Sequence, residues 1–359
     1  MDRRLFLTET LKFGALTPLF LSVPGWAEAL SDDDDWMDLV HPEYRAIIRP
    51  MMAAIGSEPI TLATLPQNRA FAKQRVQSPL VDVPWEKRMI SVGSGNPDVA
   101  IHIINAKPGA ARPAMLHMHG GGFISGNAEA AIPELQALCS TLDIAAVTVE
   151  YRLAPETTWQ GSVEDNYAAL KWLHGNAEAL GVDPARIGVM GESAGGGHAA
   201  LLAIAARDRG EVPLIFQCLN YPMLDDRTGS SRPVPDHVGK IIWTPASNRF
   251  GWESFLGMEP GGATVPTQAV PARVDDLSGL PPAWIGVGSL DLFVDENVDY
   301  AQRLNAAAVP TELIVVPGLF HGFETLPLET RIAKWFKASR LEAIRAGLGV
   351  TAEAGAATG

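Results

Sequence analysis

Short apolar segments alternate with helical stretches along this chain, and the alternation predicts an α/β fold: a mostly parallel central sheet flanked by helices, with a helical cap. Two further observations support this prediction. A run of three glycines follows one apolar segment directly, and a serine between small residues follows another. Ligands bind at the carboxyl ends of strands in open α/β sheets. The expected strands of the alternating part are residues 114–118, 144–149, 187–190, 214–219, 283–287 and 313–316.

The chain before these strands has a different pattern. Residues 36–80 have helical periodicity and show no strand alternation. Residues 85–92 and 99–104 predict an antiparallel hairpin at a sheet edge, because residues 93–97, with two glycines and a proline, form a turn between them. Later helices are expected at residues 162–180, 295–308 and 328–346.

A predicted domain organisation follows from these patterns. The central α/β domain comprises residues 81–224 and 277–347. Residues 225–276 lack strand character and are rich in proline and glycine, so we expect a second cap segment there. Residues 30–80 are the expected linker and N-terminal cap helices. The small residues of 348–359 predict a disordered tail.

Residues 1–29 resemble a twin-arginine export signal. Arg3 and Arg4 precede a moderately apolar stretch, residues 13–23, and Ala27-Glu28-Ala29 forms a small-x-small cleavage site. The apolar stretch is too short and too interrupted by glycine and proline to span a bilayer. We therefore expect an exported protein, periplasmic or secreted; the alternative is a cytoplasmic protein whose leader helix packs on the domain.

The composition excludes several classes of protein. With 47% hydrophobic and 19% charged residues, the chain is typical of a globular enzyme, and its formal net charge of −13 argues against nucleic acid as a partner. No stable membrane insertion is expected. Cys139 and Cys218 lie in apolar surroundings, which favours buried free thiols over a disulfide.

The serine lies in the segment Gly191-Glu192-Ser193-Ala194-Gly195, between an apolar strand and a run of small residues. A strand, tight turn and helix start of this kind force the serine into a strained backbone and expose its hydroxyl. Glycines flank the turn because no side chain fits where strand and helix approach. Ser193 is therefore the candidate nucleophile.

The three glycines lie in His119-Gly120-Gly121-Gly122, directly after the strand 114–118. Residues without side chains allow a close approach of the backbone, and their N–H groups can converge on a developing negative oxygen. This segment therefore predicts an oxyanion-binding loop.

A serine nucleophile needs a base and a group that orients the base. His321 is the best candidate base, because it lies in a glycine-containing loop just after the strand 313–316. The other histidines are more typical of packed or surface positions; His117 lies beside a strand and His198 in the helix after Ser193.

Asp291 is the candidate orienting acid, because it follows the strand 283–287 and lies between Ser193 and His321 in the chain. Asp295 and Glu296 compete with it. They fall where the next helix begins, and capping and the helix dipole explain carboxylates there.

Together these segments resemble the hormone-sensitive-lipase group of α/β-hydrolases, the bacterial family IV esterases. The similarity covers roughly residues 38–347 and includes Tyr151-Arg152-Leu153-Ala154-Pro155-Glu156 and His321-Gly322-Phe323. The resemblance implies an α/β-hydrolase fold, with Ser193 as nucleophile, Asp291 and His321 as its partners, and an oxyanion hole formed by the N–H groups of Gly121, Gly122 and Ala194. His119, Gly120 and Glu192 would support these motifs.

The chain departs from the family pattern in three places. Glu192 stands where bacterial members usually have Asp or Thr, and Leu292 stands where proline is usual. Thr157-Thr158-Trp159 replaces the usual His-Pro-Phe-Pro type of segment after Pro155-Glu156. We expect Glu192 to support the turn rather than to perform chemistry. The residues expected to shape the substrate pocket are aromatic: Trp159, Trp243, Trp252 and Phe255.

The resemblance implies a serine carboxylesterase that hydrolyses short-to-medium-chain esters of small molecules and requires no metal or organic cofactor. The same triad would serve an amidase, a lactonase or an acyltransferase. A non-catalytic ligand-binding protein on a hydrolase scaffold is the alternative from another class. Homodimerisation through the last edge strand is common in the resembled group and is a further expectation.

Overall fold

Eight strands form one mixed sheet in the part of the chain that the structure describes. The computed structural model describes residues 35–55, 58–74, 77–93, 95–326 and 328–351, all but Asp35 in the second of two units, Trp36–Gly359. The order across the sheet is β1-β2-β4-β3-β5-β6-β7-β8. The strands are β1 (Trp85–Ile90), β2 (Val99–Ile104), β3 (Arg112–Met118), β4 (Ala145–Val149), β5 (Val182–Glu192), β6 (Phe216–Asn220), β7 (Ala283–Gly288) and β8 (Thr311–Val316).

Strand pairing agrees with the sequence-based prediction. Strand β2 is antiparallel to both β1 and β4, and every other pair is parallel, so the predicted hairpin lies at one edge. The α/β prediction is confirmed. Strand β5 is longer than expected, because Val182 pairs with Arg112 before the register shifts. The charged and proline residues of 183–186 interrupt the apolar pattern and hid this extension.

The described helices connect the strands. They are α1 (Pro42–Ile55), α2 (Leu65–Gln74), α3 (Ile132–Leu142), α4 (Trp159–Gly175), α5 (Ala177–Leu180), α6 (Ala194–Arg209), α7 (Pro245–Leu256), α8 (Val294–Ala306) and α9 (Arg331–Gly347). The 3-10 helices are η1 (Asp35–Leu39), η2 (Ala128–Ala131), η3 (Thr267–Ala269), η4 (Pro271–Arg273) and η5 (Phe323–Thr325). The helix expected at 162–180 is divided into α4 and α5 at Asn176.

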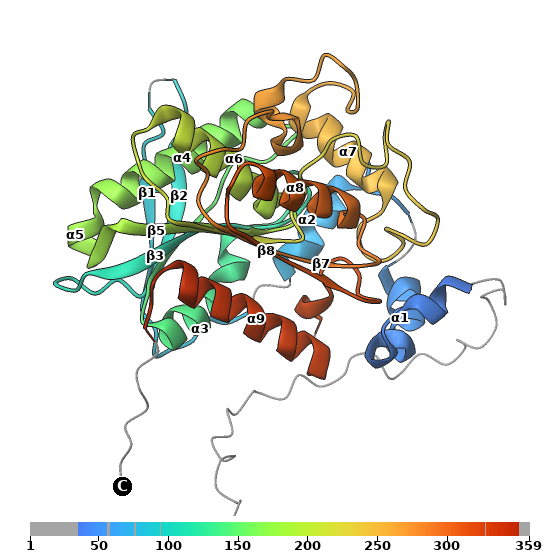
Figure 1. The fold of residues 1–359 in the computed structure, drawn as a ribbon, viewed down its shortest axis with the longest axis horizontal. Coiled ribbons are helices and arrows are strands. Elements are labelled where there is room, and N and C mark those ends of the chain that lie inside the picture. The colour runs from blue at the N-terminus through green and yellow to red at the C-terminus, as the bar shows by residue number, and fades with distance from the viewer. Residues whose placement is uncertain (1–34, 56–57, 75–76, 94, 327, 352–359) are drawn as a thin grey trace, which may run out of the picture. The chain divides into compact units, whose positions relative to one another are not determined.

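Figure 1 shows helices on both faces of the sheet, with α4, α6 and α8 on one and α3 and α9 on the other. Side chains alternate between the faces along each strand. In β3, Leu116 therefore joins the cluster under α4 and α6, whereas its neighbour Met115 joins the cluster with α3 and α9. Because strands β3 to β8 run parallel, their carboxyl ends lie at the same edge of the sheet.

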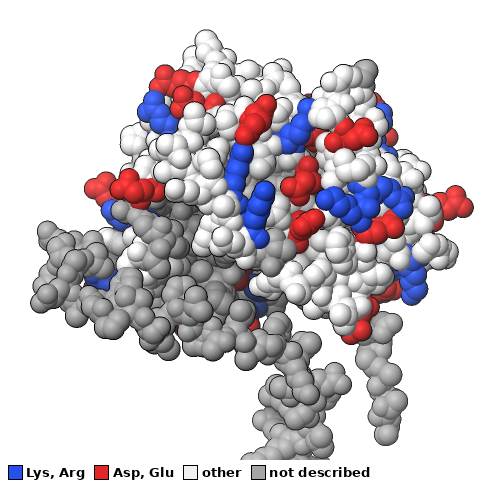
Figure 2. All heavy atoms as spheres, turned by 180° about the vertical axis from the view of Figure 1, so that it is seen from behind, with Lys and Arg blue, Asp and Glu red and all other residues white. Residues whose placement is uncertain are grey.

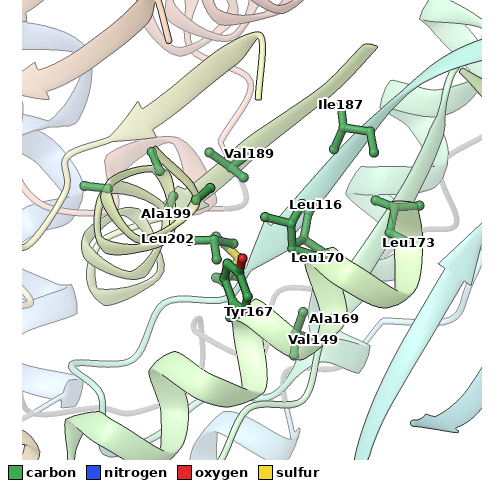
Figure 3. Close-up of a cluster of buried hydrophobic side chains, with 14 of the residues drawn as sticks. Leu116, Val149, Tyr167, Ala169, Leu170, Leu173, Ile187, Val189, Ala199 and Leu202 are labelled. Carbon is green, nitrogen blue, oxygen red and sulfur yellow. The ribbon is translucent and has the colours of Figure 1, made fainter. Parts of the chain in front are cut away.

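Close packing holds the first face together. Figure 3 shows Leu170 and Leu173 of α4, and Ala199 and Leu202 of α6, beside the strand residue Leu116. Leu170 and Leu173 are fully buried. Burial of one such leucine contributes about 2 kcal/mol relative to an exposed position. This packing provides a rigid base for the loops at the strand ends.

The cap residues form a separate cluster over these loops. Leu65 from α2 and Trp252 and Phe255 from α7 pack with Phe123, which follows the three glycines, and with Ala194, which follows Ser193. Arg69 of α2 also donates hydrogen bonds to the carbonyls of Ile124 and Ala154, at 2.7 and 2.8 Å. Part of 30–80 and part of 225–276 thus meet over the strand ends.

Helix α1 lies elsewhere than expected for a cap helix. Tyr44 and Ile48 of α1 and Val40 just before the helix are spaced four residues apart, and all three are buried in the cluster that contains α9. The Tyr44 ring packs edge-on against Phe320 at 5.5 Å. This apolar stripe explains why α1 supports the loop of His321 from the α9 side.

The end of the described chain also corrects one boundary. Leu348 is fully buried and belongs to the α9 cluster, so the domain extends past residue 347. Residues 352–359 of the expected tail and the expected export signal of residues 1–29 lie outside the described residues. Among the described helices, none has the length and apolarity that crossing a membrane requires. On the face shown in Figure 2, basic and acidic side chains are interspersed.

Candidate active site

Ser193 lies at a sharp turn between β5 and α6. Its backbone has φ 58° and ψ −121°, a conformation that side-chain-bearing residues rarely adopt and that costs about 1–3 kcal/mol. Hydrogen bonds hold the turn: the Ser193 N–H donates to Asn220 O at 2.9 Å, and the Ser193 carbonyl accepts from Gly197 N and Met223 N at 3.0 and 2.9 Å. The strained serine is therefore fixed from both neighbouring segments.

Two glycines make this turn possible. A Cβ atom on Gly191 would collide with the backbone carbonyl of Gly195, and one on Gly195 would collide with the carbonyl of Met118 at the end of β3. Backbone atoms have no room to yield at either place. The expectation that the glycines allow strand and helix to approach is confirmed.

The structure brings the three predicted residues together. His321 Nε2 lies 2.9 Å from Ser193 Oγ, and His321 Nδ1 lies 2.8 Å from Asp291 Oδ2. Ser193 and His321 are 7% and 5% exposed, and Asp291 is fully buried. Since the Asp291 carboxylate accepts from Nδ1–H, Nε2 is the atom left to accept the hydroxyl proton.

Neighbouring loops fix the acid and the base. The other oxygen of Asp291 accepts the Phe293 N–H at 2.9 Å, and the Ser289 hydroxyl accepts the Gly318 N–H at 2.8 Å. The Phe293 ring lies edge-on to the imidazole of His321 at 5.1 Å. The first bond fixes the carboxylate within the loop after β7, and the second joins this loop to the loop after β8, so Asp291 and His321 keep their mutual orientation.

The competing acids lie elsewhere. Asp295 is exposed at the start of α8. Glu296 is buried, and its carboxylate accepts the Leu224 N–H at 2.6 Å as well as the Thr228 hydroxyl. It therefore holds the segment that follows β6, away from His321.

The three-glycine loop faces Ser193. Gly121 and Gly122 have φ values of 127° and 62°, which favour glycine, and a Cβ on Gly120 would lie 3.4 Å from the Ser193 Cβ. Among the described residues, none accepts a hydrogen bond from the N–H of Gly121, Gly122 or Ala194. The arrangement is the one expected of donors to a developing oxyanion.

His119 supports this loop from within. Its Nδ1 lies 2.8 Å from the Gly120 carbonyl, which can only accept, so Nδ1 carries the proton. The Tyr151 hydroxyl donates to the His119 carbonyl at 2.6 Å, and the two rings stack at 4.2 Å. Burial lowers the pKa of His119 to about 4, so the imidazole is neutral at physiological pH.

One of the four expected pocket aromatics lies at the site. A Cβ on Gly122 would collide with the Trp243 indole, whose ring centroid lies 6.4 Å from that of His321. The indole N–H donates to the side chain of Asn248 at 3.0 Å, which fixes the ring. Trp243 therefore forms a wall beside the glycine loop.

The other three aromatic side chains pack inside the cap cluster. Trp252 is fully buried and Phe255 is 1% exposed, and both pack on Phe123 rather than facing an open pocket. Trp159 is partly buried against the same cluster. These side chains form the interior of the cap, because α7 is apolar on the face that covers Phe123.

Glu192 interacts on the opposite side of the turn from the glycine loop. Its carboxylate lies 2.9 Å from His117 Nε2 and 4.0 Å from Arg340 of α9. Sequence reasoning did not single out Arg340. The missing signal was strand parity: Glu192 lies two residues after Met190, whose side chain faces α9, so Glu192 faces α9 as well.

The remaining candidates lie outside the site. His198 is buried between Phe123 and Tyr151, and burial lowers its pKa to about 3. Cys139 and Cys218 are buried free thiols, as expected, and burial raises the pKa of each to about 12. In the described residues, no group of three or more His, Cys, Asp or Glu side chains is arranged to hold a metal ion.

Comparison with known proteins gives a consistent result. Residues 115–325 match the family described as alpha/beta hydrolase fold. The carboxylesterase NlhH of Mycobacterium tuberculosis is 37% identical over 222 residues, 60% of this chain and 68% of that protein. The ethyl acetate hydrolase of Pseudomonas putida is 31% identical over 224 residues, 60% of this chain and 67% of that protein.

Solved structures are similar over more of the chain. A bacterial heroin esterase superposes with a TM-score of 0.78 at 36% identity, covering 87% of this chain and 99% of that one. The esterase LipW of Mycobacterium marinum superposes with a TM-score of 0.69 at 31% identity, covering 87% and 96%. The similarity to these esterases thus extends over most of the chain.

Proposed function

The chain belongs to the α/β-hydrolase fold family, in its hormone-sensitive-lipase group, and from this premise we propose that it is a serine carboxylesterase that forms its acyl-enzyme on Ser193. The observation that carries the proposal is the series of two hydrogen bonds from Ser193 through His321 to Asp291, opposite a loop of glycine N–H groups. This combination provides a nucleophile, a base and an electrostatic site for the oxyanion.

In the first half of the reaction, Ser193 Oγ attacks the ester carbonyl while His321 Nε2 takes the hydroxyl proton. The N–H groups of Gly121, Gly122 and Ala194 donate to the oxyanion. Asp291 stabilises the imidazolium through Nδ1–H. The imidazolium then protonates the leaving alcohol, and the acyl group stays on Ser193.

In the second half, water replaces the alcohol. His321 takes a proton from the water as it attacks the acyl carbonyl, and the same N–H groups bind the second oxyanion. Collapse of this intermediate returns the proton to Ser193 and releases the carboxylic acid. Every step uses side chains and backbone groups of this chain, so the mechanism requires no cofactor.

The substrates are esters with short acyl groups. The Trp243 indole lies against Gly122 of the oxyanion-binding loop and is held by Asn248, so we assign it as a rigid wall of the acyl site. A rigid aromatic wall disfavours long or branched acyl groups by steric exclusion. The name of the Pseudomonas putida relative specifies an acetate ester and supports this size class.

The test compares wild type with Ser193→Ala on p-nitrophenyl esters of graded acyl length. Wild type should hydrolyse the acetate and butyrate most rapidly, and S193A should lose hydrolysis of all of them. A fluorophosphonate probe should label wild type and not S193A. Activity retained by S193A, or a wild type that does not label, would exclude the proposed mechanism.

We also propose export of the protein through the twin-arginine pathway. The basis is the sequence of residues 1–29. Replacement of Arg3 and Arg4 by lysine should retain esterase activity in the cytoplasmic fraction, whereas an unchanged distribution would contradict export by this route.

A homodimer along β8 is a further proposal. Strand β8 is the last strand of the sheet, so its outer edge has no neighbouring strand among the described residues, and its apolar Val315 is 38% exposed. Light scattering after gel filtration should give twice the mass of one chain, and a monomer at micromolar concentration would contradict the proposal.

A further inference from the structure

A buried carboxylate, Glu324, follows His321 by three residues and has no step in the proposed reaction. It lies in η5 and is 4% exposed, and burial raises the pKa of its carboxyl group. Burying a carboxyl group costs free energy unless hydrogen bonds compensate. Its partners therefore indicate what it does.

The two hydrogen-bond partners of Glu324 are Asn220, the last residue of β6, and Tyr221, the residue that follows it. Oε1 accepts the side-chain N–H of Asn220 at 2.6 Å and the hydroxyl of Tyr221 at 2.7 Å. All three residues are buried. One carboxylate oxygen thus joins the loop after β8 to the end of β6, two segments that are not adjacent strands.

Each partner contacts one member of the catalytic pair. The Asn220 carbonyl accepts the Ser193 N–H at 2.9 Å and so holds the strained turn. The Tyr221 ring lies 4.7 Å from the His321 imidazole at 63°, and Tyr221 has a φ of 35°, which a side-chain-bearing residue rarely adopts. The hydroxyl bond to Glu324 offsets this strain and keeps the ring against His321.

A buried arginine accompanies this carboxylate. Arg340 of α9 is 7% exposed, and its positive charge lowers the pKa of Glu324 in opposition to burial. It also pairs with Glu134 of α3 and lies 4.0 Å from Glu192. Arg340 therefore pairs with glutamates of two other segments, and its positive charge also acts on Glu324.

Strand parity explains why these groups meet. Met115, Met190 and Cys218 of β3, β5 and β6 belong to the cluster on the α9 face. Two residues further along the same strands lie His117, Glu192 and Asn220, and side chains two apart share a face. The carboxyl ends of three adjacent strands thus place polar side chains toward Arg340.

We propose that Glu324 is a positioning residue whose Oε1 atom, through Asn220 and Tyr221, holds Ser193 and His321 in hydrogen-bonding geometry. This inference rests on the proposed function, because it assigns Glu324 a role toward that catalytic pair. Misplacement of a reacting group lowers the rate of the chemical step more than substrate binding. The signature is therefore a fall in kcat at constant KM.

The experiment compares Glu324→Leu with Glu324→Gln on p-nitrophenyl acetate. Leucine removes the acceptor, whereas glutamine places an amide oxygen at the same position and can accept both bonds. We expect E324L to lose at least fivefold in kcat with KM within twofold of wild type, and E324Q to stay within fivefold in kcat. The rescue by glutamine separates positioning from the mere loss of a buried group.

Glu296→Leu is the matched control, because Glu296 is also a buried, hydrogen-bonded glutamate but contacts Leu224 and Thr228 instead of the catalytic pair. It should keep kcat within fivefold. A kcat of E324L within fivefold of wild type, or an E324Q or E296L variant that falls as far as E324L, would overturn the proposal.

If E324L does not fold, Tyr221→Phe replaces it, because it deletes one of the two bonds and leaves the ring. Its kcat should fall at least twofold at constant KM, and an unchanged kcat would overturn the proposal. Fluorophosphonate labelling of wild type distinguishes a failure of the proposed esterase function from a failure of the proposed role of Glu324. A wild type that does not label defeats the proposed function, whereas a labelled wild type with an unaffected E324L defeats only the role of Glu324.

Discussion

The two sides of Ser193 are built with different chemistry. On the oxyanion side, the glycine loop is held by neutral contacts: the His119 imidazole, the Tyr151 hydroxyl and the Trp243 indole. On the triad side, the turn and the His321 loop are held by charged groups: the part-buried Glu192 lies 4.0 Å from Arg340, and the charge of this arginine also acts on the buried Glu324. One side is fixed by shape and the other by electrostatics.

The difference has a chemical reason. A negative charge develops on the oxyanion side, and a permanent carboxylate there would oppose it, so neutral donors and close packing are suited to that side. On the triad side a positive imidazolium develops, and nearby carboxylates stabilise it. The two sides should therefore fail in different ways when altered.

The largest effect should come from the acid of the triad. Asp291→Asn keeps the shape but lets His321 adopt the wrong tautomer, and the equivalent change in a serine triad lowers kcat by about 10⁴. The measurement is kcat on p-nitrophenyl acetate, with circular dichroism to show an unchanged fold. A loss below tenfold would mean that another carboxylate orients His321.

The next largest effect should come from removing the charge of Arg340 on the triad side. Arg340→Met leaves Glu134 and Glu192 without their ion-pair partner and removes the positive charge that acts on Glu324. Breaking a buried ion pair costs about 3–5 kcal/mol. Because the Glu134 side chain is 56% exposed and regains hydration, we expect the lower end of that range in urea unfolding. Lys171→Met is the control: it removes the exposed partner of Glu211 and should leave the urea midpoint unchanged. Equal midpoints for R340M and wild type would contradict an electrostatic role.

On the oxyanion side, the corresponding test is steric. Gly122→Ala places a methyl group into the Trp243 indole and displaces an oxyanion donor, so kcat should fall about 10². G122A combined with Trp243→Ala should recover part of the rate, because the clash is removed.

Gly210→Ala is the matched control for backbone strain alone. Gly210, at the C-terminus of α6, has a φ of 65°, similar to the 62° of Gly122, but a Cβ placed on it would meet no atom within 4 Å. The substitution should cost about 1 kcal/mol of stability and leave kcat unchanged. If G210A lowers kcat as much as G122A, general destabilisation rather than the clash explains the loss.

The sequence predicted those features that depend on local pattern. Apolar runs predicted each parallel strand, and the glycine-containing loops after β3, β5 and β8 identified His119, Ser193 and His321. In each case a strand end and a turn lie within a few residues, so the physical cause is contained in one short segment.

Features that depend on distant packing were not predictable in the same way. Trp243 and Trp252 both belong to an aromatic cap segment, and only the course of the chain before α7 places Trp243 on Gly122 and Trp252 in the interior. Arg340 is 148 residues beyond Glu192 in the sequence, and a helical periodicity gives its face but not its partner. Which side chains of β5 and β6 lie together near Arg340 depends on the register between these two strands. The pattern of one segment does not contain this register.

The smallest effect is a dependence of stability on pH, and its sign should differ between the two sides. On the triad side, burial raises the pKa of Glu324 above that of an unfolded glutamate, about 4.3, so the folded state holds this proton more tightly. The contribution is favourable below the unfolded pKa and is lost as the pH rises through the folded pKa. Glu324→Gln does not titrate, so its melting temperature relative to wild type should increase from pH 4 to pH 8, by roughly 2 °C for 1 kcal/mol.

On the oxyanion side, His119 should give the opposite slope. Its folded pKa of about 4 lies below the value of an unfolded histidine, about 6.5, so its contribution is favourable above the unfolded pKa and is lost as the pH falls toward the folded pKa. The melting temperature of His119→Gln relative to wild type should therefore increase as the pH falls from 7 to 4. A difference between E324Q and wild type that stays constant with pH would mean that Glu324 ionises as freely in the folded chain as in the unfolded one. The triad side would then owe its geometry to shape, as the oxyanion side does.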